Sequence, residues 1–361
     1  MIKEVKKYNY CLDYIKGIAC ICVVLMHCEF PGKLGIIVQT MSRFCVPFFF
    51  MVSGYFASNL AQNPIGDKKL LIFNKKVIHI AKIAFYASLF YLAFAVIQYL
   101  IWHDVSLKVS KSNVLIFLFF NEPFIIAGQL WFLFALLYDY IIITVLDNFK
   151  LQKFEYVAGI TMLVLFYFLG QGIYIIGGGV RVPDFVVKDF GGNIPHIVDN
   201  RVPIPNFLYR NFLFEGFAFF MLGRLIHKNK DRLRFNNTTL LIVIAISTIL
   251  CVVERQLIGR DFGVNLCTLP QVVALFIYGI NNPNRHKGTI QQLGKNCSML
   301  VYILHPFVWH SMERVYDGLG IANNITALYL LPIIVVLLSI GLAILCNWFA
   351  DNVQLKKQTV K

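Results

Sequence analysis

The stretch YIKGIACICVVLMHCEF, from Tyr14 to Phe30, decides the fold, because its length and composition are those of a helix that crosses a membrane. It is mostly apolar, yet it holds Lys16 near one end and His27 near the other. A helix turns by about 100° and rises by about 1.5 Å per residue, so these two side chains share one face about 16 Å apart. They cannot touch, but they can contact two parts of one long ligand.

The composition of the whole chain points the same way. Of its 361 residues, 58% are hydrophobic and 14% are charged, and the mean hydropathy is +0.67. A soluble protein is usually about half apolar and about one quarter charged. The 33 Phe and 17 Tyr suit surfaces that face lipid and the membrane interface. The composition predicts an all-α, polytopic membrane protein.

About ten transmembrane helices are expected. The basic residues set their orientation: with the N-terminus inside, cytoplasmic segments hold 19 of the 33 Lys and Arg. Both termini are therefore predicted to be cytoplasmic, and the net charge of +14 reports topology rather than nucleic-acid binding. The predicted spans cover residues 11–29, 36–57, 77–101, 128–146, 156–176, 207–226, 239–253, 264–280, 297–313 and 325–349.

One membrane domain over residues 1–361 is expected, with no soluble catalytic domain and no cleavable signal peptide. The segment 177–205 is predicted to be a long extracytoplasmic loop, which serves either as a connector or as a lid. A second apolar stretch, 114–126, is broken at Asn121 and is expected at the interface. The nine Cys lack zinc-binding spacing, so no metal site is expected.

Three charged or titratable residues in the first two spans are candidates for function. Lys16 and His27 either reach the two interfaces of the membrane or face the interior of the bundle, where charged residues mark pathways. Arg43, which lies four residues before Pro47, either anchors an interface or binds an anion or a substrate oxygen.

A basic segment, NKKVIHIAKIAFY, opens the third span. Lys76, His79 and Lys82 follow at steps of three and lie close to one helix face, with Lys75 beside them. Anchoring at the cytoplasmic interface explains Lys75 and Lys76, whereas Lys82 lies deeper than an anchor requires. Such a cluster suits phosphate groups.

Later spans hold further polar candidates. Arg210 and Glu215 stand five residues apart in RNFLFEGFAFFMLG, about 140° around a helix, which predicts partners on other helices. They serve either as structural ion pairs or in a site. Tyr302 and His305 share a face of YILHPFVWH, where His305 is either a hydrogen-bonding core residue or a second imidazole of the site.

Together these pieces resemble the acyltransferase-3 family of integral membrane acyltransferases. Six stretches carry the resemblance in family order: LDYIKGIACICVVLMHCEF, RFCVPFFFMVSGYF, KKVIHIAK, the LWFL of QLWFLFALLY, RNFLFEGFAFFMLG and YILHPF. The first and fifth are similar to the membrane domains of vancomycin-resistance serine racemases, a branch of that family. The chain departs from the family pattern at Lys16, where Arg is common, and at Gln129, where His is common. Lys76 and His79 stand where users of acyl-coenzyme A often show an Arg pair.

The resemblance implies an O-acetyltransferase that moves an acyl group from cytoplasmic acyl-coenzyme A (acetyl-coenzyme A), a co-substrate rather than a bound cofactor, to a hydroxyl of a cell-envelope glycan or lipid-linked acceptor. It implies that His27 is the general base and that Lys16 and Arg43 assist. The implied donor-binding and acceptor or channel residues are Lys75, Lys76, His79 and Lys82, and Trp131, Tyr138, Arg210, Glu215, Tyr302 and His305, respectively.

The expected location is the bacterial cytoplasmic membrane, with membrane lipid as a neighbour and a homo-oligomer left open. The racemase-like stretches also support an alternative function, a transporter or serine uptake module. A third and weaker alternative is a non-catalytic scaffold. The enzyme hypothesis predicts that His27→Ala abolishes function while leaving folding intact.

Overall fold

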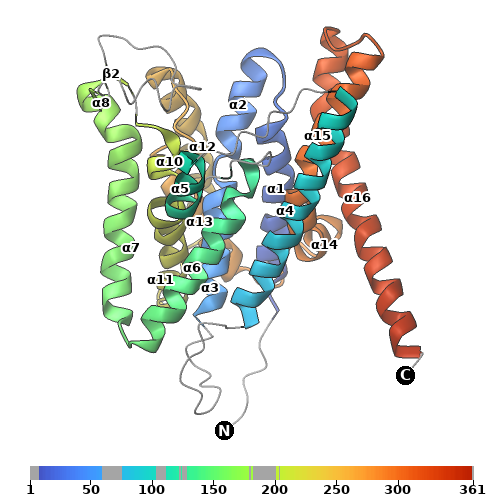
Figure 1. Ribbon diagram of the computed structural model, residues 1–361. Coiled ribbons are helices and arrows are strands. Elements are labelled where there is room, and N and C mark those ends of the chain that lie inside the picture. The colour runs from blue at the N-terminus through green and yellow to red at the C-terminus, as the bar shows by residue number, and fades with distance from the viewer. Residues whose placement is uncertain are drawn as a thin grey trace. The chain divides into compact units, whose positions relative to one another are not determined.

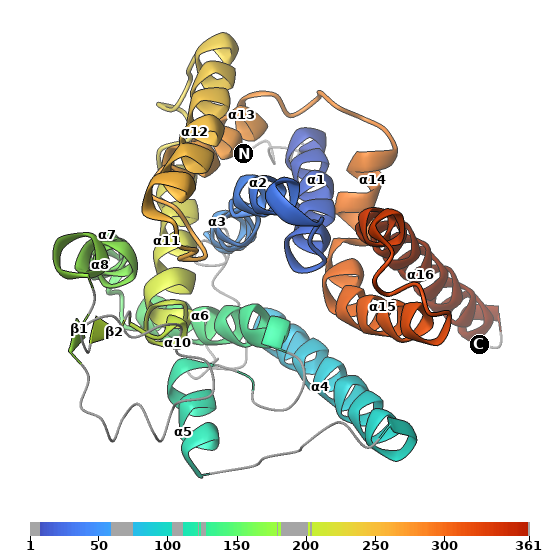
Figure 2. The ribbon, with the colours of Figure 1, turned by 90° about the horizontal axis from the view of Figure 1, so that it is seen from above.

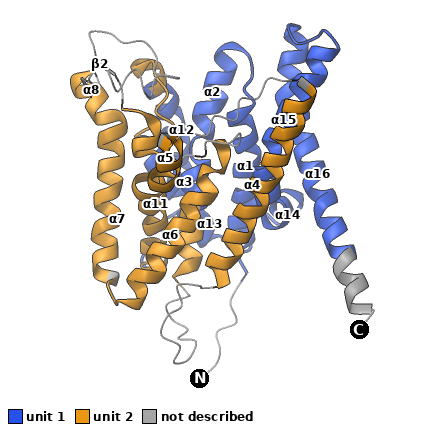
Figure 3. Cartoon of the chain, in the orientation of Figure 1, with its two compact units in different colours: residues 1–49, 230–254, 267–361 blue, residues 50–229, 255–266 orange. Residues whose placement is uncertain are grey.

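The computed structural model describes residues 8–58, 75–102, 111–121, 123, 128–178, 180–181, 201–202 and 204–359. The regular structure in these residues is helical except for two short strands (Figure 1). The helices form two compact units that interleave along the chain (Figure 3). Unit 1 consists of residues 1–49, 230–254 and 267–361, and unit 2 consists of residues 50–229 and 255–266.

Unit 1 begins with the helix that the opening stretch predicts. Asn9 caps this helix, α1 (Tyr10–His27), by accepting a 2.9 Å hydrogen bond from the backbone N–H of Leu12. The other helices of unit 1 are α2 (Gly32–Ser42), the first turn of α3 (Cys45–Ala57), most of α12 (Asn237–Ile258), α13 (Thr268–Asn281), α14 (Thr289–Asn296), α15 (Ser298–Gly318) and α16 (Ile325–Thr359).

Two glycines allow α1 and α14 to pack backbone against backbone. A Cβ on Gly17 would overlap the carbonyl oxygen of Ile290, and a Cβ on Gly294 would overlap that of Asp13. The view from above shows α14, α15 and α16 gathered on one side of α1 (Figure 2). Because any side chain larger than hydrogen would push these helices apart, the two glycines fix how close α14 lies to α1.

Unit 2 has a less regular interior. Two short π-helices interrupt it, and such bulges occur often at functional sites. Its elements are the rest of α3, α4 (Lys75–Trp102), α5 (Lys111–Phe120), η1 (Gly128–Leu130), α6 (Trp131–Asn148), α7 (Gln152–Tyr167), η2 (Phe168–Gly172), α8 (Ile173–Gly177), β1 (Val180–Arg181), β2 (Arg201–Val202), α10 (Asn206–Tyr209), η3 (Phe212–Gly216) and α11 (Phe217–Lys228).

Seven segments among the described residues are long and apolar enough to cross a membrane, which confirms an all-α polytopic membrane protein. Three predicted spans, 207–226, 264–280 and 297–313, correspond to helices outside this set. The total of ten crossings and the cytoplasmic termini stay predictions. The seven segments are Tyr10–His27, Gly32–Ala57, Lys75–Ile101, Gly128–Asn148, Lys153–Gly177, Asn237–Ile258 and Ile325–Asn352.

Two expectations about connections meet the structure only in part. Most of the predicted loop 177–205 lies outside the described residues, but its ends pair as antiparallel strands, with Val180 opposite Val202. The apolar stretch 114–126 ends its helix at Asn121, the predicted break, where φ is +52°.

Candidate active site

In unit 1, α1 carries both residues that the opening stretch singled out. The Nζ of Lys16 lies 3.0 Å from Oδ1 of Asp13, one turn earlier, and the Tyr8 hydroxyl donates to the other oxygen of that carboxylate. Both partners of the ion pair are partly exposed, at 20% and 15%. His27 is the last residue of α1 and is half-buried. Lys16 is thus held near one end of the helix and His27 at the other, as the sequence predicts.

The structure brings His27 next to a second imidazole. The ring centres of His27 and His305 lie 5.2 Å apart, and the rings are tilted by 35°. His305 belongs to α15 and is fully buried. The ring of Tyr302, which the sequence also placed on this face, lies 6.4 Å from that of His305. The N-terminal and C-terminal parts of the chain therefore contribute one imidazole each to a single place in unit 1.

One hydrogen bond defines the tautomer of His305. Its Nδ1 lies 3.2 Å from the carbonyl oxygen of Val301, and a carbonyl can only accept, so Nδ1 carries the proton. In a neutral ring Nε2 is then the accepting nitrogen. This Nε2 is buried and makes no hydrogen bond with the described part of the chain. His305 thus keeps a proton-accepting atom in a buried position close to His27.

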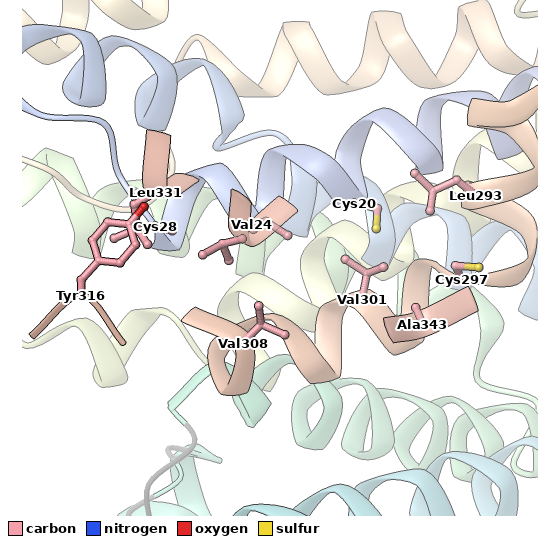
Figure 4. Packing of buried hydrophobic residues seen from close by; sticks show 11 residues of the cluster. Cys20, Val24, Cys28, Leu293, Cys297, Val301, Val308, Tyr316, Leu331 and Ala343 are labelled. Carbon is pink, nitrogen blue, oxygen red and sulfur yellow. The ribbon is translucent and has the colours of Figure 1, made fainter. Parts of the chain in front are cut away.

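Packing between α1 and the C-terminal helices holds the two imidazoles together. Cys20, Val24 and Cys28 line the side of α1 that packs against α15 and α16 (Figure 4). Cys28 is 2% exposed and belongs to this apolar cluster, so it is a packing residue rather than a nucleophile next to His27. The partners of these three residues in the cluster are Leu293, Cys297, Val301, Val308, Tyr316, Leu331, Val335 and Ala343.

Arg43 lies at the break between α2 and α3, where its backbone N–H donates to the carbonyl of Thr40 at 3.3 Å. The residue is 9% exposed, and its role as an interface anchor or as a binder of an anion stays a prediction.

In unit 2, the structure corrects the prediction for Arg210 and Glu215. The two residues pair directly, with 3.2 Å between Nε of Arg210 and Oε2 of Glu215. The prediction of separate partners counted 100° per residue along one continuous helix. Instead, α10 ends at Tyr209, Arg210 follows it as the C-cap, Asn211 is extended, and η3 begins at Phe212. The break in the helix lets the guanidinium reach back to the carboxylate.

Trp131 and the loop around Gly263 enclose this ion pair. The guanidinium of Arg210 lies over the Trp131 ring at 5.4 Å, and Gly263, at φ +81°, packs against the same guanidinium. The side-chain amide of Asn121 bonds to both α6 and η3. Its N–H donates to the carbonyl of Trp131 at 2.9 Å, and its oxygen accepts from the N–H of Phe212 at 2.7 Å. The aromatic ring and the π-helix are thereby fixed relative to each other.

Tyr138 and the basic segment lie elsewhere in unit 2. The Tyr138 hydroxyl donates to the carbonyl of Leu118 at 3.4 Å, and its ring packs on Phe212. On α4, the Nζ of Lys76 lies 5.7 Å from the centre of the Tyr140 ring. The other three members of the segment, Lys75, His79 and Lys82, are exposed on the same helix.

The sequence analysis missed several buried charges of unit 2. Arg224 forms two hydrogen bonds to Asp147, at 2.9 and 3.3 Å, and lies 3.1 Å from the buried carboxylate of Glu155. Asp139, in the middle of α6, is fully buried. The sequence signal that could have found Asp139 is an ionisable residue inside an apolar run, because such a residue is by default a candidate for function.

Comparison with known proteins completes the assignment. Residues 9–350 match Acyl_transf_3, described as an acyltransferase domain. The chain belongs to the acyltransferase-3 family. This membership confirms the predicted resemblance and supports a membrane acyltransferase as its general class. The chain is also 25% identical over 357 residues to a serine/alanine racemase of Enterococcus gallinarum. The alignment covers 92% of this chain and 45% of that acyltransferase-3 relative, so the chain spans less than half the relative's length. No solved structure matches the chain.

Proposed function

We propose that this acyltransferase-3 protein moves an acetyl group from cytoplasmic acetyl-coenzyme A to a hydroxyl of a cell-envelope glycan, in the bacterial cytoplasmic membrane. The observation that supports this most directly is the placement of His27, half-buried, 5.2 Å from the ring of the buried His305. A neutral imidazole accepts a proton near neutral pH, as a general base for a hydroxyl must.

In the proposed step His27 takes the proton of the acceptor hydroxyl. The hydroxyl oxygen forms a bond to the carbonyl carbon of the thioester, and the bond between that carbon and sulfur breaks. The thiolate of coenzyme A leaves and takes up a proton, while the acetyl ester stays on the acceptor. His305, whose Nδ1 is occupied by the Val301 carbonyl, offers Nε2 as an acceptor close to His27 and acts as a positioning residue.

The donor's phosphates are assigned to cations. Lys16 and Arg43 of unit 1 are assigned to assist the reaction. The basic segment of α4 supplies the cations for the phosphates, because ammonium groups bind phosphate as point charges. For the acceptor we assign Tyr302 in unit 1 and, separately, Tyr138, Trp131, Arg210 and Glu215 in unit 2. The donor residues on α4 are Lys75, Lys76, His79 and Lys82.

Purified protein in lipid nanodiscs tests the proposal. Incubation with radiolabelled acetyl-coenzyme A and envelope glycans is expected to give labelled ester, and His27→Ala is expected to lower the rate by at least about 10²-fold. His310→Ala is the matched control, because His310 is on α15, is 42% exposed and pairs with Glu313. Lack of both donor binding and donor hydrolysis would contradict the proposal.

A second candidate function is uptake of a small amino acid. The match to a protein named a serine/alanine racemase favours it, since that match covers 92% of this chain and under half of the racemase. Vesicles that contain the protein would then accumulate radiolabelled serine with no acyl donor present. Accumulation that His27→Ala leaves unchanged would favour uptake over transfer.

A further inference from the structure

A group of lysines surrounds the start of α1, and the proposed function uses only one of them. Lys16 pairs with Asp13, and the hydroxyl of Tyr8 donates to the same carboxylate. The Nζ of Lys295, in the last turn of α14, lies 5.0 Å from the centre of the Tyr8 ring. Two lysines from different helices are therefore joined through one tyrosine and one carboxylate.

A third lysine comes from the loop between α13 and α14. The Nζ of Lys287 lies 4.4 Å from the centre of the Tyr10 ring. The ring centres of Tyr10 and Tyr8 are in turn 4.6 Å apart, in an edge-to-face contact. Lys16, Lys287 and Lys295 thus form one connected group in unit 1, the α1 lysine cluster.

Several contacts hold the loop of this third lysine against α1. The backbone N–H of Tyr10 donates to the carbonyl of Pro283 at 2.8 Å. The ring of His286 stacks on that of Tyr14, with ring centres 4.6 Å apart, and its Nε2 lies 3.1 Å from the hydroxyl of Tyr278. Because these contacts fix both the backbone and the neighbouring side chain, the lysine that follows His286 has a defined place.

The ammonium groups of Lys287 and Lys295 are open to an anion. Both side chains are exposed, and among the described residues they contact tyrosine rings and form no ion pair with a carboxylate. The cluster consists of three cations beside one acid, Asp13, which leaves a net charge of +2. An aromatic ring orients an ammonium group without neutralising it, so the charge stays available to a phosphate.

The distance from this cluster to His27 matches the length of the donor. Lys16 lies eleven residues before His27 on α1, which is a rise of about 16 Å. In coenzyme A about 13 bonds join the sulfur to the nearest phosphorus, and at about 3.3–3.6 Å for three bonds this chain extends to about 15 Å. The α14 helix reaches the same level, because Gly294, next to Lys295, packs on the carbonyl of Asp13. A thioester held at His27 therefore has its first phosphate at the level of the cluster.

We propose that the α1 lysine cluster binds the phosphates at the nucleotide end of the acyl donor, so that the pantetheine arm runs along α1 from Lys16 to His27. The inference rests on the proposed function and adds Lys287 and Lys295 to its donor site. Each ammonium group meets phosphate oxygens as a point charge, and the tyrosine rings hold the two added lysines in place. The basic segment of α4 belongs to unit 2 and is tested by separate variants.

Nucleotide binding to the full chain in phosphatidylcholine nanodiscs tests the proposal. The probe is adenosine 3′,5′-bisphosphate, which carries phosphates but neither the arm nor the thioester. Calorimetry is expected to give a Kd that rises at least about fivefold in Lys287→Gln and in Lys295→Gln. The unfolding temperature of both variants is expected to stay unchanged, because both side chains are exposed.

Lys228→Gln is the matched control. Lys228 is also exposed and also lies over a tyrosine ring, 4.6 Å from the centre of Tyr156, but it belongs to unit 2. Its substitution is expected to leave the nucleotide Kd within about twofold of wild type. An equal loss of affinity in this control would overturn the proposal, since binding would then follow the total surface charge.

Two acyl donors separate phosphate binding from a structural effect. The KM for acetyl-coenzyme A is expected to rise at least about fivefold in Lys287→Gln and Lys295→Gln while kcat changes little. Acetyl pantetheine has the arm and the thioester but no phosphate, so both variants are expected to use it at the wild-type rate. A similar loss with both donors would overturn the proposal.

An unchanged nucleotide Kd in the double variant Lys287→Gln, Lys295→Gln would also overturn it. Nanodiscs that contain phosphatidylglycerol then show whether the lysines bind lipid headgroups instead, since the double variant would retain less of this lipid than wild type. Because the nucleotide assay contains no thioester, its outcome is independent of acyl transfer. Labelled ester together with an unchanged Kd contradicts this site alone, whereas lysine-dependent nucleotide binding without ester contradicts the proposed function alone.

Discussion

The imidazole of His27, at the end of α1, lies 5.2 Å from that of His305, which is buried in α15. The ring of His27 is half-buried, and the Nδ1–H of His305 donates a hydrogen bond to the Val301 carbonyl. This arrangement pairs an accessible imidazole with one whose tautomer and orientation are fixed. A neighbour whose tautomer and orientation are fixed can orient the general base beside it.

The two imidazoles are expected to act as one unit. If His305 works through His27, the variant His305→Leu slows acetyl transfer by about tenfold or more, and the double variant with His27→Ala is no slower than His27→Ala alone. Steady-state rates of the four proteins of this cycle check it. Fully additive losses, with His310→Ala at the wild-type rate, would mean that the two rings act separately.

Lys16 is expected to contribute to donor binding rather than to the chemical step. Replacing it with Met removes one ion pair to phosphate, so the KM for acetyl-coenzyme A rises by about tenfold while kcat changes little. Lys16→Arg keeps the positive charge, and its KM is expected to stay within about threefold of wild type. A fall in kcat with unchanged KM for Lys16→Met would contradict this assignment.

Close packing of α1 on α14 is expected to be sensitive to a single methyl group. Gly17→Ala and Gly294→Ala force a Cβ into a backbone carbonyl, so each should lower the free energy of unfolding by about 1–3 kcal/mol. Gly341→Ala in α16 is the control: a Cβ there meets nothing within 4 Å, and a gain of up to about 1 kcal/mol is expected. Thermal unfolding followed by tryptophan fluorescence compares the three variants. Equal effects at all three positions would exclude steric contact as the cause.

Arg224 is expected to be a stability residue of unit 2. Replacing it with Met leaves the carboxylates of Asp147 and Glu155 without their buried cation, and breaking such a pair costs about 3–5 kcal/mol. Arg234→Met, at an exposed position, should stay within about 0.5 kcal/mol of wild type. Chemical unfolding of both variants gives the two values. A loss below about 1 kcal/mol for Arg224→Met would mean that solvent replaces the pair.

The sequence predicts the site best where one regular element carries it. Lys16 and His27 lie on one helix, so the helical period alone places them, and α1 contains both. The same reasoning gives a wrong prediction for Arg210 and Glu215, because the helix breaks between them. This break depends on the N-terminal cap that Asn211 provides for η3. The helical period of a single helix cannot predict the contact of His27 with His305, because packing of α1 against α15 creates that contact.

The omission of Asp139 has a different cause. Within the run LLYDYIII a single acidic residue hardly lowers the apolar character, so the span is recognised while its one charge is overlooked. Its interest lies in what surrounds it, namely Gly216 at the end of η3, and no pattern along α6 indicates that neighbour. Composition and periodicity therefore predict which helices exist, but not which buried charges lack a partner.

The interleaving of the two units affects how the protein is made. The polypeptide passes between them four times, at residues 49–50, 229–230, 254–255 and 266–267. The helix α1 leaves the ribosome first, yet the side-chain amide of Asn9 at its start bonds to the carbonyl of Gly279, 270 residues later in the sequence. During most of translation, α1 therefore lies in the bilayer before its native neighbours α13 to α16 have been synthesised. In a nascent chain arrested before α14, the thiol of Cys20 on α1, which is 2% exposed in the finished protein, should consequently be open to a thiol reagent.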